Sequence, residues 1–158
     1  MPATPATTFL EAKKIAFELL EYAHDRRAEA YGLEAAEKLG LDPASVFKTL
    51  VVSDGAGAHA LALVPVARKL GLPLVARALR WKRAEMADKA DAQRLTGYVL
   101  GGISPFGTRR PLPVVADDAL MRPGEIHLSG GRRGLEIRIA PQDLVTALAA
   151  LVTAIAVD

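Results

Sequence analysis

Two glycine-rich segments carry the residue types best suited to build a binding site from the main chain. The first is TGYVLGGISPFG, residues 96–107, and the second is SGGRRGLE, residues 129–136. Glycine has no side chain to hold a ligand away from the backbone, and a rigid array of N–H donors can stabilise a developing oxyanion. The alternative for both segments is a tight turn. The donors and hydroxyls that we expect at the site are those of Gly101, Gly102, Ile103, Ser104, Ser129 and Gly130.

Lys48 is the strongest single candidate for chemistry. It lies in VFKTLVV, where strand alternation places it on one face with Val46, Leu50 and Val52. An ammonium group among apolar side chains is costly unless it is paired, and a partly desolvated lysine can carry a proton or hold an anion. The alternative is an edge-strand lysine that discourages aggregation or reaches water along its stem.

The sequence predicts neither a metal site nor a cofactor. His24, His59 and His127 lie far apart and belong to no recognised metal-ligand pattern. No GxSxG elbow and no phosphate-binding loop occurs, although a catalytic triad can also assemble in space. The chain has no cysteine, so any sulfur chemistry has to come from the substrate.

The net charge does not identify a nucleic-acid partner, because 20 Lys and Arg residues face 18 Asp and Glu residues. The clustering of the basic residues is more informative. Arg109 with Arg110 and Arg132 with Arg133 adjoin the two glycine segments, and contacts to nucleic-acid phosphates would use such positions. The alternative is an ordinary solvated surface.

The chain predicts one domain, residues 1–158, since it has 158 residues, 51% of them hydrophobic, and no internal repeat. Residues 1–7 read as a frayed tail, followed by a helix that the T-x-x-E capping box from Thr8 to Glu11 would open. No stretch has the pattern of a secretory signal or the roughly 18 apolar residues of a membrane span. We therefore expect a cytoplasmic protein.

The hydrophobic periodicity predicts helices and strands that do not alternate regularly. This order favours an α+β fold in which a mixed β-sheet curls into a partial barrel with helices around it. Helices are expected over residues 30–39, 74–79, 84–95 and from 141 to about 155. Strands are expected over residues 46–53, 60–66, 113–116, 126–129 and 135–140.

Together with VFKTLVV, EMAD (85–88) and YAHD (22–25), the glycine segments resemble the YbaK/EbsC family of free-standing deacylases, which clear cysteine wrongly attached to proline tRNA. Order and spacing agree from about Lys14 to the end. The resemblance implies the fold of the YbaK and prolyl-tRNA synthetase editing domains. It also implies a strand over residues 15–22, with Ile15, Phe17 and Leu19 on one face.

The resemblance assigns roles to individual residues. Lys48 falls on the family's functional lysine, Gly101 and Ser129 supply donors, and Tyr22 and Tyr31 shape the pocket. Glu136 departs from the pattern, because the family more often has aspartate there, one methylene shorter. The other residues expected to bind substrate are Thr49, Gly102, Ile103, Ser104, Gly130 and Glu136.

These observations predict a trans-acting deacylase for Cys-tRNA(Pro), in which the substrate's own thiol attacks its ester while the site supplies orientation and electrostatics. The resemblance also implies a ternary complex with tRNA and prolyl-tRNA synthetase. Two alternatives stay open. One is an Ala-tRNA(Pro) deacylase that uses a bound water, and the other is a non-catalytic module that holds the 3′ end of tRNA or a partner protein.

Overall fold

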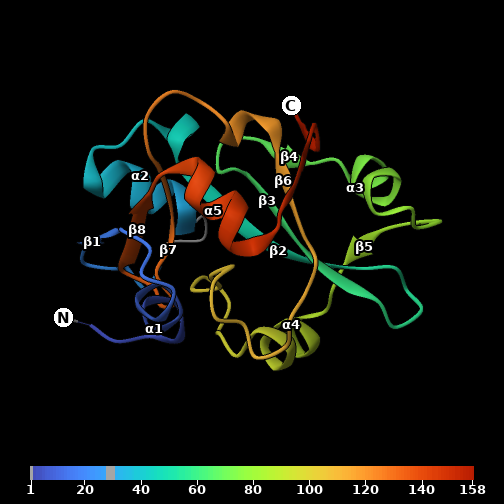
Figure 1. Ribbon diagram of the computed structural model, residues 1–158, viewed down its shortest axis with the longest axis horizontal. Helices are drawn as coiled ribbons and strands as arrows, with labels where there is room; N and C mark the ends of the chain where they lie inside the picture. The colour runs from blue at the N-terminus through green and yellow to red at the C-terminus, as the bar shows by residue number, and fades with distance from the viewer. Residues whose placement is uncertain (1, 28–30) are drawn as a thin grey trace.

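The computed structural model describes residues 2–27 and 31–158. Its largest sheet has five strands in the order β5-β2-β3-β6-β9 (Figure 1). The hairpin expected from the sequence is present, because β2 (Phe47–Ser53) and β3 (His59–Pro65) pair antiparallel. β6 (Val114–Asp117) joins β3 in parallel, and β9 (Leu151–Thr153) joins β6 in parallel. The sheet is therefore mixed, and the predicted α+β class is confirmed.

The outer edge of β2 is covered at both ends and open between them, because Val46 just before the strand bridges to His127 and the end of the strand pairs with another strand. The short strand β5 (Glu85–Met86) pairs only with Val52 and Ser53. The Val51 carbonyl points to this outer side, where it accepts a hydrogen bond from the Ala87 N–H at 3.0 Å. Backbone groups alternate along an antiparallel strand, so the N–H and C=O of Thr49 also point away from β3. This free edge becomes part of the candidate site.

A second, antiparallel sheet has the order β1-β8-β7. Its strands are β1 (Glu18–Glu21), β8 (Leu135–Ile139) and β7 (Ile126–Ser129). The strand expected over residues 15–22 is thus shorter than predicted. In the register of the sheet, Glu136 lies opposite Ser129 on one side and opposite Leu20 on the other.

The two sheets share one hydrophobic core. Buried side chains from β2 and β3 pack there with those of β7 and β8: Phe47, Val51, Leu61, Leu63, Ile126, Leu128, Ile137 and Ile139. A second cluster covers the other face of the large sheet and includes Val75 from α3 (Leu72–Leu79). Because β3 is buried on both faces, it reads as a nearly continuous apolar run.

The N-terminus is ordered where the sequence predicts a frayed tail over residues 1–7, and that prediction is wrong for the residues described; residue 1 lies outside them. Helix α1 spans Pro5–Ala12 and begins after Thr4, not at Thr8. Thr4 Oγ1 accepts from the Thr7 N–H at 3.2 Å, and Thr7 Oγ1 accepts from the Thr4 N–H at 2.9 Å. Thr4 Oγ1 also donates to the Gly130 carbonyl at 2.6 Å, so the N-terminal segment is fixed to the second glycine segment.

The helix predicted over residues 84–95 is shorter in the structure. Helix α4 spans Lys89–Thr96, because the Asp88 carboxylate caps it by accepting from the Asp91 N–H at 2.7 Å. Gly97 ends the helix at φ +80°, as predicted. Helix α2 spans Tyr31–Leu39; the expected first residue, 30, lies outside the described residues.

The last helix is also shorter than predicted. Helix α5 spans Pro141–Leu148, and the chain then forms β9 and β10 (Ala156–Val157), which pairs with β4 (Lys69–Leu70). The buried Asp117 carboxylate accounts for the difference, since it accepts from the N–H groups of Ile155 and Ala156 at 2.9 and 2.8 Å. A side chain distant in sequence thus holds the C-terminal segment extended. Within the described residues no helix has the length and apolar character needed to span a membrane.

Replacing Thr4 with alanine should lower the free energy of unfolding by about 1–2 kcal/mol, because the cap of α1 and the bond to Gly130 are both lost. Urea denaturation measures this. Thr8→Ala is the matched control, since Thr8 is exposed inside the helix and alanine is the better helix former. A larger loss for Thr8→Ala than for Thr4→Ala would contradict the observed cap.

Candidate active site

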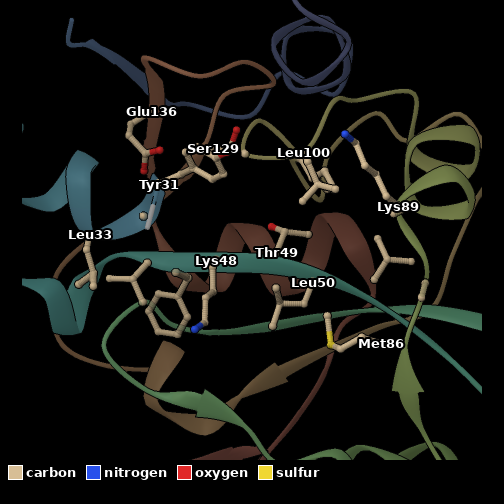
Figure 2. A pocket seen from close by; sticks show the side chains of 18 of the residues that line it. Tyr31, Leu33, Lys48, Thr49, Leu50, Met86, Lys89, Leu100, Ser129 and Glu136 are labelled. Carbon is tan, nitrogen blue, oxygen red and sulfur yellow. The ribbon is translucent and has the colours of Figure 1, made fainter. Parts of the chain in front are cut away.

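A cavity of about 420 Å³ lies along the free edge of β2 (Figure 2). Its wall comes from α2, β2, the start of α4, the first glycine segment and the β7–β8 pair. Segments far apart in the sequence therefore meet at one place. The described residues that line it include Tyr22, Tyr31, Leu33, Lys48, Thr49, Leu50, Met86, Lys89, Leu100, Gly101, Ile103, Ser129 and Glu136.

Glu136 is the most unusual side chain of the cavity. It is only 6% exposed, and its Oε2 atom has no hydrogen-bond partner among the described residues. Burial raises the pKa of Glu136 to about 8, because an ionised carboxylate loses its hydration there. The carboxyl is therefore largely protonated at neutral pH in the free protein.

Thr49 presents a second buried polar group to the cavity. Its Oγ1 atom has no hydrogen-bond partner among the described residues. The N–H and C=O of Thr49 also lie on the free edge of β2, as described above. Buried polar groups are normally hydrogen-bonded, so an unpaired hydroxyl and an unpaired carboxyl in one cavity indicate places that a polar ligand fills.

The Lys48 side chain lies on the face of β2 opposite that of Thr49 (Figure 2). In Figure 2 it runs away from Glu136 and Ser129, while Leu50 shares its face, as alternation predicts. Lys48 is half-buried, and this burial lowers the pKa of its ammonium group. A ligand that wraps the edge of β2 would therefore meet Lys48 on one face and Glu136 on the other.

The two glycine segments pack against each other. A Cβ atom on Gly101, which has φ +86°, would lie 2.6 Å from Arg133 Nε and 2.8 Å from the Tyr31 ring. A Cβ atom on Gly102 would lie 2.8 Å from the Cα of Arg132. These distances are too short for a side chain, so packing favours glycine at both positions, and the positive φ favours it at Gly101 as well.

Arg133 stabilises the contact between the two glycine segments. Its Nε and one terminal nitrogen both donate to the Leu100 carbonyl, at 3.0 and 2.7 Å, and its guanidinium lies 4.4 Å from the centre of the Tyr31 ring. The side chain expected to bind tRNA thus joins the β7–β8 hairpin to the first glycine segment and to α2. We call this set of contacts among Arg133, Leu100 and Tyr31 the arginine clamp.

The structure divides the predicted main-chain donors into two groups. Gly101, Ile103 and Ser129 line the cavity. Gly102, Ser104 and Gly130 are buried behind its wall. There the Gly102 N–H donates to the Val99 carbonyl at 3.0 Å and the Gly130 N–H to the Leu135 carbonyl at 2.8 Å. Ser104 Oγ accepts from the Phe106 N–H at 3.3 Å, so its role in the structure is a turn contact.

Both predicted tyrosines line the cavity. Burial raises the pKa of Tyr22, whose N–H donates to the Gly134 carbonyl at 3.0 Å. The Tyr31 ring contacts the Arg133 guanidinium and lies 5.9 Å from the His24 ring, centre to centre. His24 Nδ1 in turn contacts the buried Glu34 at 2.8 Å. Burial alone would raise the pKa of Glu34, but hydrogen bonds from His24, the Asp25 N–H and Lys38 lower it.

The residues around the cavity that sequence reasoning missed include two apolar side chains, a second lysine and a buried acid. Leu33, Met86 and Lys89 line the cavity, and Glu34 supports Tyr31 through His24. Isolated residues of these types carry no signal in a single sequence. Among the described residues, no group of three or more His, Asp or Glu side chains could hold a metal ion.

The other basic residues lie at the rim or farther away. Arg132 is exposed and pairs with Glu21 at 3.3 Å, a contact of the kind that contributes little to stability. Arg109 and Arg110 are exposed after the end of α4, with their N–H groups donating to the carbonyls of Thr96 and Leu95. None of these three side chains lines the cavity.

Comparisons with known proteins place this chain in a family. The sequence model of the aminoacyl-tRNA editing domain matches residues 28–147. The chain is 30% identical over 146 residues to a protein of Enterococcus faecalis named "Putative Cys-tRNA(Pro)/Cys-tRNA(Cys) deacylase EbsC", covering 90% of this chain and 87% of that relative. It is 34% identical over 82 residues to the multifunctional Ser/Thr-tRNA deacylase ProXp-y of Escherichia coli K12, about half of each chain (51% and 49%).

A solved structure agrees with these relatives. The crystal structure of a "putative trans-editing enzyme for prolyl tRNA synthetase" superposes with a TM-score of 0.87 at 25% identity, covering 100% of both chains. The fold and the site thus define an enzyme that acts on the ester bond of aminoacyl-tRNA. The chain belongs to the aminoacyl-tRNA editing domain family, of the YbaK/EbsC type, and the resemblance seen in the sequence is confirmed.

Glu136 should make stability depend on pH. The folded protein holds this proton up to about pH 8, whereas an unfolded glutamate releases it near 4.5. The unfolded state therefore binds fewer protons in this interval, and the free energy of unfolding falls as pH rises through it. Glu136→Gln should show a weaker fall in melting temperature between about pH 5 and about pH 9.

The matched control is Glu37→Gln, because Glu37 is exposed on α2. It should follow the wild-type profile. If the melting temperatures of wild type and Glu136→Gln fall by the same amount across this pH range, the buried carboxyl does not hold its proton.

Proposed function

We propose that the protein removes cysteine from mischarged Cys-tRNA(Pro). The observation that carries the proposal is the pair of buried, unpaired polar atoms, Thr49 Oγ1 and Glu136 Oε2, in a cavity beside the half-buried Lys48. Such a cavity suits a small, polar aminoacyl group. The choice of cysteine is supported by the relative in Enterococcus faecalis, which matches most of the chain.

In this proposal the substrate's α-ammonium binds at Glu136. A lone buried carboxylate is unfavourable, but an ammonium partner stabilises the ionised form. The acid is thus neutral in the free enzyme and becomes a carboxylate when the amino group arrives. The unpaired edge of β2 and the Thr49 hydroxyl take the remaining polar groups of the aminoacyl ester.

The chemistry uses the thiol of the substrate. The cysteine sulfur attacks the ester carbonyl carbon, a carbon–sulfur bond forms, and the bond to the ribose oxygen breaks. The thiol proton goes to the departing ribose oxygen, and the four-membered thiolactone then takes up water to give cysteine. Gly101 and Ser129 donate to the developing oxyanion, and Lys48 neutralises charge on the tRNA side.

A panel of aminoacyl-tRNAs tests the substrate. Cys-tRNA should be deacylated quickly, Ser-tRNA slowly and Ala-tRNA hardly at all, since alanine and serine fit the cavity but lack a thiol. One small group more or less in a tolerant pocket changes the binding free energy by only about 1–3 kcal/mol. If the rate for Ala-tRNA falls below that for Cys-tRNA by more than this free energy explains, the sulfur takes part in the chemistry. The measurement is the first-order rate of ester loss at saturating enzyme.

The alternatives give different rate orders in the same assay. Comparable rates for Cys-tRNA and Ala-tRNA indicate a bound water as nucleophile and overturn the thiol mechanism. Fast cleavage of Ser-tRNA and Thr-tRNA would align the chain with ProXp-y of Escherichia coli instead. An unchanged ester lifetime at saturating protein indicates a module that only binds the 3′ end of tRNA or a partner.

Lys48→Ala should reduce the deacylation rate by on the order of 100-fold or more while the protein stays folded, because in this proposal the ammonium neutralises charge on the tRNA side and contributes little to packing. Lys48→Arg should fail as well, since a planar guanidinium does not replace a compact ammonium. Lys82→Ala, at an exposed lysine outside the cavity, is the control. A folded Lys48→Ala protein with wild-type rate would remove Lys48 from the mechanism.

We further propose that selectivity for proline tRNA comes from prolyl-tRNA synthetase in a ternary complex. The described cavity is large enough for the aminoacyl end alone, and the trans-editing structure that superposes on the chain is named for that synthetase. Adding the synthetase should then speed deacylation of Cys-tRNA(Pro) more than that of Cys-tRNA(Cys).

A further inference from the structure

The cavity contains a second lysine, at the start of α4. Lys89 is the first residue of this helix, its side chain is exposed, and it lines the cavity. The carboxylates of the two acidic residues nearest to Lys89 in this segment already accept hydrogen bonds from other groups. The Asp88 carboxylate accepts from the Asp91 N–H at 2.7 Å, and the Asp91 carboxylate accepts from Arg94 at 3.0 Å. The Lys89 ammonium is thus available to a ligand.

Lys89 lies across the cavity from the acyl-binding groups. Figure 2 shows Glu136, Ser129 and Tyr31 together at one end, while Lys89 reaches in from α4 beside Leu100 at the other end. Thr49 lies between the two ends. The cavity therefore has a direction, with hydrogen-bonding groups for an amino acid at one end and a positive charge at the other.

The charge balance of the cavity favours an anion. Burial keeps the Glu136 carboxyl protonated, as described above. Among the described lining residues, Lys48 and Lys89 are then the groups that carry charge at neutral pH. Positive charge that no lining carboxylate balances raises the local concentration of anionic ligands.

We propose that Lys89 binds the 5′ phosphate of the terminal nucleotide of tRNA and so sets the direction in which the aminoacyl end enters. This inference rests on the proposed deacylase function. A lysine ammonium is a compact point charge that suits a phosphate oxygen, and hydrogen bonds between charged groups are stronger than neutral ones. Lys89 is a positioning residue in this scheme, because it touches the phosphate and not the reacting ester.

Two small substrates test the contact. They are 3′-O-cysteinyl adenosine and the same ester with a 5′ phosphate. Wild type should cleave the phosphorylated ester with a kcat/KM about tenfold higher, the size expected for one charge-assisted hydrogen bond. Lys89→Ala should bring that ratio to about one by raising KM for the phosphorylated ester, with kcat unchanged. Lys89→Glu should reverse the preference.

Lys69→Ala is the matched control, because Lys69 is exposed on β4, outside the cavity. It should keep the wild-type ratio. A Lys89→Ala protein that retains the wild-type preference, or a wild type that cleaves both esters equally, would overturn the role of Lys89 while leaving the deacylase function intact.

Binding separates this proposal from the catalytic one. The 3′-cysteinylamido analogues of adenosine, with and without the 5′ phosphate, cannot be cleaved, and calorimetry gives their dissociation constants. Tighter binding of the phosphorylated analogue that Lys89→Ala abolishes supports the contact even where no ester is cleaved. Equal binding of both analogues by wild type rejects it, whatever the outcome of the deacylation panel.

Discussion

The close approach of the two glycine segments is the constraint on which the site depends. Gly101 and Gly102 leave no room for a Cβ atom between themselves and Arg132, Arg133 and Tyr31. Because these segments touch, Arg133 can reach the Leu100 carbonyl and cover the Tyr31 ring. One arginine thereby holds together a loop, a hairpin and a helix that would otherwise meet only through side-chain packing.

The same contact changes how the glycines are to be interpreted. They were expected to present N–H groups to a substrate, yet the N–H groups of Gly102 and Gly130 complete turns of the wall. The main chain of β2 also borders the cavity, where the edge around Thr49 lies between the bridge to His127 and the pairing with β5. Because β5 is short, this part of the edge can supply main-chain groups to a ligand in addition to Gly101. This arrangement leaves backbone donors and acceptors open to a ligand while the rest of the sheet stays paired.

The sequence predicts helices, strands and turns correctly where the residues that determine them are close together in the chain. The β2–β3 hairpin, the end of α4 at Gly97 and the position of Lys48 on its strand face follow from turn residues, caps and alternation. The failures have long-range causes. Thr4 caps α1 and bonds to Gly130, 126 residues away, and Asp117 holds the backbone of Ile155 and Ala156 extended. No periodicity within one segment can reveal a partner in another.

The candidate site shows the same division. Lys48, Tyr22, Tyr31 and Glu136 come from the family resemblance, and all four line the cavity. Lys89 and Glu34 were not predicted, because an exposed lysine at a helix start and an acid on a helix look like ordinary surface residues. Only the fold shows that one faces the cavity and that the other is buried beneath His24 and Tyr31.

In the proposed mechanism the buried Glu136 gives the site selectivity for an aminoacyl ester with a free α-amino group. A buried carboxyl without a hydrogen-bond partner lowers the free energy of unfolding by about 1–3 kcal/mol. The free protein limits this cost by holding the proton, and an α-ammonium removes it by pairing with the ionised form. A substrate whose amino group is blocked, such as an N-acylated ester or a peptidyl-tRNA, brings no charge to Glu136. The proposed site would therefore exclude peptidyl-tRNA and admit aminoacyl-tRNA, and the choice among aminoacyl-tRNAs would have to come from the side chain and the tRNA.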